Sequence, residues 1–117
     1  MTIKFERQVI KNPDGKIKYR IFNKGGKEHL HIGVWLDADV EQLKKIESVQ
    51  YELHPSFKRS VRQSRDRENK FSVTIWTWGM FNITATINYT DGSNSEHSYY
   101  LSYDLPADTG ENYILID

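Results

Sequence analysis

Apolar and polar side chains alternate along several short stretches of this sequence. The clearest stretch is residues 81–89, FNITATINY, and residues 71–75, FSVTI, show the same pattern shortly before it. A period of two places every second side chain on one face of a β-strand, whereas an amphipathic helix has a period of about 3.6 residues. The sequence therefore predicts strands that each bury one face.

Other parts of the chain add strands and one helix. Val40, Leu43 and Ile46 recur at three-residue spacing behind Asp39, a favourable N-cap, and this predicts about two turns of helix. A turn over 12–15 between two apolar alternations predicts an opening hairpin, and the polar residues 58–70 predict a long loop or a weak edge strand. The further predicted strands cover residues 3–5, 17–21, 30–36, 49–54, 99–103 and 113–116.

The order of these elements restricts the fold class. Seven or eight short strands with one minor helix describe an immunoglobulin-like β-sandwich of antiparallel strands, because a parallel α/β sheet would need a helix after each strand. A chain of 117 residues has the length of one domain, so we expect residues 1–117 to form a single sandwich.

The composition excludes several classes of function. The 16 Lys and Arg residues balance 16 Asp and Glu residues, so no overall charge attracts the chain to nucleic acid or to anionic lipid. No apolar run approaches the roughly 20 residues of a membrane-spanning helix, and we expect no membrane contact and a cytoplasmic location. The chain has no cysteine, which excludes disulfides and thiolate chemistry.

The sequence carries no catalytic motif. It has no Gly-rich phosphate loop, no nucleophile elbow and no paired-carboxylate motif, so we expect a protein that is not an enzyme and has no cofactor. His29 and His31 fall on one face of a strand, but no third ligand accompanies them, and we expect no metal site.

Aromatic, hydroxyl and imidazole side chains gather where two predicted strands end. Two loops at one end of a sandwich would combine these groups into a flat aromatic slot that suits a planar amide. An alternative is that the rings only cap the core while the imidazole bonds to a backbone carbonyl. The candidate ligand-binding residues are His54, Ser56, Phe57, Trp78, Gly79 and Phe81.

The same residues carry a family resemblance. The block VQYELHPSF at 49–57, then Phe71, then WGMF at 78–81 resembles the V-x-Y-x-L-H-x-S/T-F … G-W-G-x-F pattern of YEATS domains. The short chain and the segment 37–39 are more similar to the prokaryotic branch, and the resemblance covers roughly residues 29–105. It implies an immunoglobulin-like fold and a non-enzymatic reader domain that binds acetyl-lysine or crotonyl-lysine peptides.

The resemblance also implies a role for each candidate residue. Trp78 and Phe57 would be the stacking walls of the slot. Ser56 would hydrogen-bond the amide and His54 would orient Ser56. Gly79 and Phe81 follow Trp78 in the motif. Gly79 would let the backbone approach the ligand, and Phe81 would close the pocket floor.

Two other interpretations remain open. The chain is alternatively a protein-interaction or ligand-sensing module of a bacterial defence or signalling assembly. Another alternative is nucleic-acid contact through the basic segment 58–70, although Asp66 and Glu68 interrupt its charges as in a solvated loop. The basic residues of this predicted patch are Lys58, Arg59, Arg62, Arg65 and Arg67.

Overall fold

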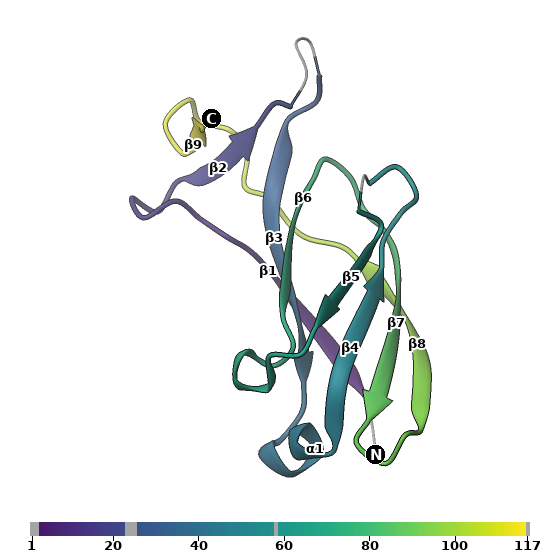
Figure 1. Cartoon of the computed structure of the whole chain (residues 1–117). Coiled ribbons are helices and arrows are strands. Elements are labelled where there is room, and N and C mark those ends of the chain that lie inside the picture. The colour runs from purple at the N-terminus through teal and green to yellow at the C-terminus, as the bar shows by residue number, and fades with distance from the viewer. Residues whose placement is uncertain (1–2, 23–25, 58, 117) are drawn as a thin grey trace.

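The strands form two sheets that pack face to face. This computed structural model describes residues 3–22, 26–57 and 59–116, which measure 50 × 28 × 21 Å along their principal axes. Figure 1 shows the arrangement. The elements are β1 (Lys4–Val9), β2 (Ile17–Arg20), β3 (His29–Asp37), α1 (Val40–Lys44), β4 (Ile46–Glu52), β5 (Val61–Ser64), the 3₁₀-helix η1 (Arg67–Asn69), β6 (Val73–Thr77), β7 (Phe81–Tyr89), β8 (Asn94–Leu101) and β9 (Tyr113–Leu115).

The sheet order confirms the predicted immunoglobulin-like sandwich. One sheet has the order β1-β3-β2-β9 with β6 on the other side of β3, and the second has the order β5-β4-β7-β8. All pairs are antiparallel except β2 with β9, which is parallel. The described residues hold nine strands, against the seven or eight predicted. The additional strand is β5, which forms as an edge strand within residues 58–70, where the sequence predicted a long loop or a weak edge strand.

The core lies between the inner faces of both sheets. Alternate side chains of β7 point into it, as the period of two predicted, as do Leu30, Ile32, Val34 and Leu36 of β3. Tyr51 of β4 is fully buried there. The Tyr51 hydroxyl donates a 2.7 Å hydrogen bond to the carbonyl of Phe71, just before β6. Lys70 and Phe71 both adopt a positive φ of 54°, so the chain enters β6 through a sharp backbone turn.

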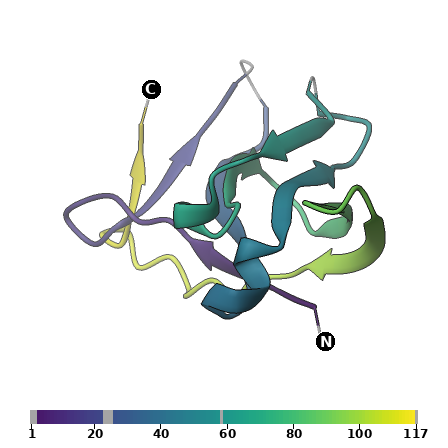
Figure 2. The ribbon, with the colours of Figure 1, turned by 60° about the horizontal axis from the view of Figure 1, so that its bottom comes forward.

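The predicted helix begins at the expected place but ends early. The backbone N–H of Gln42 donates to Asp39 Oδ1 at 2.8 Å, and the Gln42 side chain accepts from the Asp39 backbone N–H at 3.3 Å, which completes a capping box. The helix ends at Lys44 because Ile46 already belongs to β4. Figure 2 views the sandwich from the end that carries α1. No helix in the described residues is long and apolar enough to cross a membrane.

The predicted opening hairpin is wrong beyond its turn. A single bridge, Lys11 with Ile17, joins its two arms. Instead, β1 and β2 both pair with β3, at Val9↔Ile32 and at Tyr19↔Leu30, so they lie in succession along one side of it. The nine residues of β3 offer enough backbone for both strands, and the pairing on β3 continues the large sheet.

Candidate functional site

Two loops bring the predicted site residues to one end of the sandwich. β4 ends at Glu52 and leads into His54–Phe57, and β6 ends at Thr77 and leads into Trp78–Met80. Figure 1 shows both loops at the end opposite α1, where the chain also enters β3. We call the six predicted residues at this place the loop end.

His54 and Ser56 form the polar part of the loop end. Ser56 Oγ lies 2.8 Å from His54 Nδ1, and the backbone N–H of Ser56 donates to the same nitrogen at 3.1 Å. A backbone N–H is always a donor, so Nδ1 is an acceptor and carries no proton. The Ser56 hydroxyl is therefore the hydrogen-bond donor to Nδ1. The lone pairs of the Ser56 oxygen stay free to accept a hydrogen bond from another group.

Phe57 and Phe81 form the apolar part. Their ring centroids are 5.3 Å apart at an interplanar angle of 50°, and both rings are half-buried against the core. The Phe57 backbone N–H donates to the His54 carbonyl at 3.0 Å and closes the turn. This pair caps the core, as the alternative interpretation of these rings expects.

Trp78 is exposed and has a cationic neighbour. Its side chain is 55% exposed, and the Lys27 ammonium lies 3.7 Å from the centroid of its ring. No ring contact between Trp78 and Phe57 occurs in the described residues, where Phe57 packs on Phe81 instead. The sequence analysis did not identify Lys27, because one lysine in a polar loop carries no signal for a contact with a ring 51 positions away along the chain.

The backbone of Gly79 is fixed by two hydroxyl groups. Thr77 Oγ1 and the Tyr103 hydroxyl donate to the Gly79 carbonyl at 3.1 and 3.2 Å. The Gly79 N–H donates to Thr77 Oγ1 at 3.3 Å. A Cβ added to Gly79 would meet no atom within 4 Å, and its φ lies outside the positive range. The fold itself therefore does not require glycine here.

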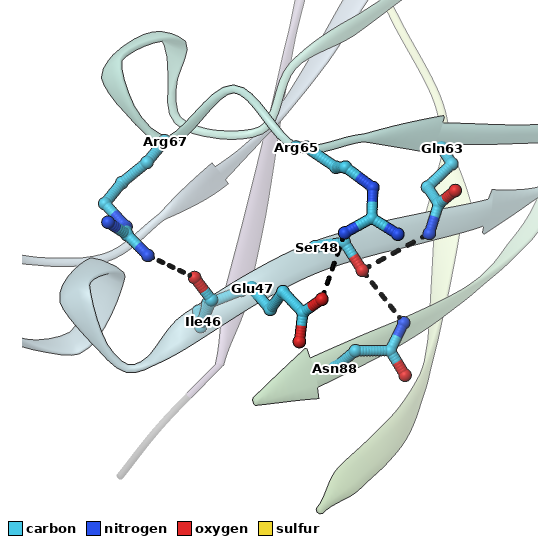
Figure 3. A network of polar contacts seen from close by, with 7 residues as sticks. All are labelled: Ile46, Glu47, Ser48, Gln63, Arg65, Arg67 and Asn88. Carbon is cyan, nitrogen blue, oxygen red and sulfur yellow. Dashed lines mark hydrogen bonds and ion pairs between the residues drawn. The ribbon is translucent and has the colours of Figure 1, made fainter. Parts of the chain in front are cut away.

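The basic segment makes mostly structural contacts, which Figure 3 shows in part. Arg65 pairs with Glu47 at 3.0 Å. Arg67 donates to the carbonyls of Leu43 and Ile46 at 3.0 and 2.9 Å, at the end of α1 and the start of β4. Arg62 donates to the Arg59 carbonyl at 2.7 Å, and Lys58 lies outside the described residues.

The described residues contain an open groove away from the loop end and no candidate metal site. An open groove of about 580 Å³ runs between β1 and β8 and is lined by residues such as Phe5 and His97, far from the loop end. In the described part of the chain, no group of three His, Cys, Asp or Glu residues is placed to hold a metal ion.

Known proteins resemble this chain in sequence and in fold. The sequence model of the prokaryotic YEATS domain matches residues 30–102, more than half of the chain. Among solved structures, the fold resembles the Yaf9 YEATS domain bound to H3K27ac, with a TM-score of 0.57 and 16% identity over 92% of this chain and 72% of that chain. It also resembles the yeast AF-9 homolog protein Yaf9, with a TM-score of 0.58 and 15% identity over 86% of this chain and 67% of that one.

A third structure is the Yaf9 YEATS domain recognizing an H3K122suc peptide. Its TM-score is 0.56 at 15% identity, over 84% of this chain and 66% of that chain, so this chain spans slightly less than two thirds of it. At such identities the likeness to solved structures shows the fold alone. No curated protein matches the sequence. The match of the family model over most of the sandwich shows that the chain belongs to the prokaryotic YEATS domain family.

Proposed function

We propose that this chain is a non-enzymatic binding module that recognises acylated lysine in peptides at the loop end. The observation that carries the proposal is the hydroxyl of Ser56, which His54 holds at 2.8 Å at the same end of the sandwich as the exposed ring of Trp78. Family membership supports it, because the Yaf9 YEATS domain of the same fold has been solved with H3K27ac and with an H3K122suc peptide.

The polar groups of the loop end match the chemistry of an acylated lysine. The amide N–H of such a side chain is a donor, and the Ser56 oxygen can accept from it while the Ser56 O–H donates its hydrogen bond to His54 Nδ1. The Trp78 indole offers a flat surface for the planar acyl amide. A neutral hydrogen bond contributes about 1 kcal/mol, and one stacking contact contributes about 1 kcal/mol beyond the burial of apolar area. With so few specific contacts, we expect micromolar or weaker affinity.

Lys27 is the competitor for the same ring. Its ammonium lies 3.7 Å from the Trp78 centroid, so an acyl group that stacks on this face of the indole must displace it. A cation over an exposed aromatic ring contributes about 0.5–1 kcal/mol, which a stacking ligand can exceed. An uncharged acyl-lysine and the lysine of this chain thus compete for one surface.

An NMR titration tests this function. Peptides that carry acetyl-lysine, crotonyl-lysine or unmodified lysine are added to labelled protein while the Trp78 indole and the Ser56 amide are followed. We expect saturable shifts with the acylated peptides alone, and loss of these shifts in the Trp78→Ala variant. Equal shifts with unmodified lysine, or none at millimolar peptide, would contradict the proposal.

Gly79→Ala is the informative companion variant. Since an added Cβ meets no atom of the chain within 4 Å, this variant is expected to fold normally. Weaker binding of the acylated peptide by Gly79→Ala then reports a ligand that approaches the Gly79 backbone. If the alternative function holds, a protein-interaction or ligand-sensing module in a bacterial defence or signalling assembly, Trp78→Ala disrupts partner binding without any preference for acylated lysine.

A further inference from the structure

A lysine of this chain already lies on the ring to which the proposed function assigns an acylated lysine. The Nζ atom of Lys27 lies 3.7 Å from the centroid of the Trp78 ring. Acylation would turn this atom into the nitrogen of a planar amide. Its distance from the ring falls within the roughly 3.5–4.0 Å of the best van der Waals contact between carbon atoms. An acyl amide built on Lys27 can therefore stack on Trp78 while the lysine nitrogen keeps its position.

The backbone of Lys27 is anchored beside this ring. His29 Nδ1 lies 2.9 Å from the Lys27 carbonyl, and because a carbonyl only accepts, this nitrogen carries a proton and is the donor. His29 is the first residue of β3, and its ring makes an edge contact with Phe22 at 4.9 Å between centroids. Since β3 pairs with β6 and Trp78 directly follows β6, strand pairing sets the distance between the Lys27 backbone and the indole.

Both groups are open to solvent. Lys27 is exposed, and the Trp78 side chain is 55% exposed. In the described part of the chain Lys27 forms no ion pair, so its acylation breaks no contact with a carboxylate. Acylation removes the positive charge, and with it the cation–π contact, and leaves an amide that stacks on the same ring.

We propose that Lys27 is an acylation site whose acyl group occupies the loop end of its own chain and so excludes acylated peptides. The inference rests on the proposed function, because the chain itself supplies the acylated lysine to the same slot. The donor is an acyl thioester. The neutral amine of Lys27 attacks the thioester carbonyl carbon, a C–N bond forms while the C–S bond breaks, and the leaving thiolate takes up the proton that the nitrogen loses.

An acyl-lysine within the chain competes through its effective concentration. A short flexible tether keeps its group at about 1 mM near the site. Against a dissociation constant of about 0.1 mM, the tethered group occupies the slot about nine-tenths of the time, and the apparent affinity for free peptide falls about tenfold. A neutral substitution of Lys27 removes a competitor, whereas acylation creates a stronger one. The two changes are therefore expected to act in opposite directions.

Site-specific replacement of Lys27 by acetyl-lysine tests the inference, and the same replacement of the exposed Lys11 is the matched control. Isothermal titration calorimetry measures the affinity of each protein for an acetyl-lysine peptide. We expect about tenfold weaker binding after acetylation of Lys27, no change after acetylation of Lys11, and tighter binding by Lys27→Ala. Without peptide, the NMR signal of the Trp78 indole in the protein acetylated at Lys27 should move toward its position in the peptide-saturated unmodified protein.

The outcomes separate this inference from the proposed function. If the unmodified protein binds the peptide and acetylation of Lys27 leaves the affinity unchanged, the inference fails and the proposed function stands. An indole shift that grows with protein concentration would show contact between chains and would also overturn it. If the unmodified protein binds no acylated peptide, the proposed function fails. Circular dichroism confirms that each protein is folded.

The reaction has its own test. The native protein is incubated with acetyl-coenzyme A, an acyl thioester, and the acetylated positions are followed by peptide mass spectrometry. Lys27 is expected to react at least as fast as Lys11, since both are exposed. Acetylation of Lys11 without acetylation of Lys27 would overturn the assignment of Lys27 as an acylation site.

Discussion

The basic residues of segment 58–70 and those on the outward face of β2 lie in different surroundings, which the number of basic residues in each stretch does not reveal. Residues 58–70 hold six Lys or Arg side chains within thirteen positions, whereas β2 offers only Lys18 and Arg20 to the outer face. Arg65 and Arg67 of the dense segment bind carboxylate and carbonyl oxygens of the chain, while Lys18 and Arg20 lie beside the ring of Trp76. A run of basic residues thus does not locate a binding surface, because each side chain first satisfies acceptors within its reach.

The loop end shows the same division within a short distance. Thr77 and Tyr103 fix the backbone of Gly79, and Phe81 caps the core with Phe57. Ser56 and Trp78 are exposed, and the proposed function assigns the ligand to them. Substitutions that separate structural groups from exposed ones test this comparison.

Tyr51→Phe is expected to lower the free energy of unfolding most, because it removes the hydrogen bond that holds the backbone directly after the basic segment. The Tyr51 hydroxyl bonds to the carbonyl of Phe71 in the core at 2.7 Å, and the variant leaves that carbonyl without this donor. We expect a loss of about 1–3 kcal/mol in the free energy of unfolding, measured by urea denaturation. A loss below the experimental error would show that this bond does not anchor the segment.

Alkaline pH gives a second measurement of the same group. Burial raises the pKa of Tyr51 above its ordinary value of 10.0, so the folded state resists losing this proton more than the unfolded state does. The contribution of Tyr51 to stability is therefore complete below pH 10 and falls as the pH rises above it. The Tyr51→Phe variant should lose less stability than the wild type over this range.

Arg67→Ala is expected to lower stability by about 1–2 kcal/mol, because two backbone carbonyls lose a charged donor. The control is Arg65→Ala, whose exposed ion pair with Glu47 contributes about 0.2–1 kcal/mol. A larger effect of Arg65 than of Arg67 on thermal unfolding would reverse this division of the segment.

Ser56→Ala is expected to weaken binding of an acetyl-lysine peptide by about two- to tenfold, the contribution of one neutral hydrogen bond. The melting temperature should hardly change, because the Ser56 side chain is exposed. Isothermal titration calorimetry measures the affinity, and Ser98→Ala, an exposed serine on β8, is the matched control. Unchanged affinity in Ser56→Ala would remove the hydroxyl from the proposed site.

Lys27→Ala is expected to strengthen binding of the same peptide by about two- to fivefold, because the ligand no longer displaces a cation from Trp78. Lys27→Arg should keep the wild-type affinity. Lys11→Ala, at another exposed lysine, is the control. Weaker binding in Lys27→Ala would mean that the ammonium contacts the ligand and does not compete with it.

Local patterns were sufficient for most of the fold. The period of two located β7 closely, a dense apolar run located β3, and Asp39 marked the start of α1. The opening hairpin could not be assigned correctly, because the turn at residues 12–15 gives local geometry only and β3 competes for both arms. For residues 58–70 the sequence allowed a long loop or a weak edge strand, and only the pairing of β5 with β4 decides for the edge strand.

The candidate site was predictable only in part. The motif gave Ser56 and His54, whose contact spans two positions and is local. Lys27 over Trp78 joins the segment before β3 to the loop after β6, and the stack of Trp76 on His31 joins β6 to β3. Both contacts span a long stretch of chain. No sequence spacing reports such a contact, because it depends on which strands pair.

The sequence by itself determined the strand pattern, the helix start and the family, since each depends on residue types at short spacing. What each cation contacts depends on the tertiary structure. Strand pairing brings Lys18 and Arg20 beside Trp76, and folding brings Arg67 to the carbonyls at the end of α1. The physical reason is that a side chain binds whatever acceptor or ring the fold places within reach, and that placement is a property of the whole sandwich.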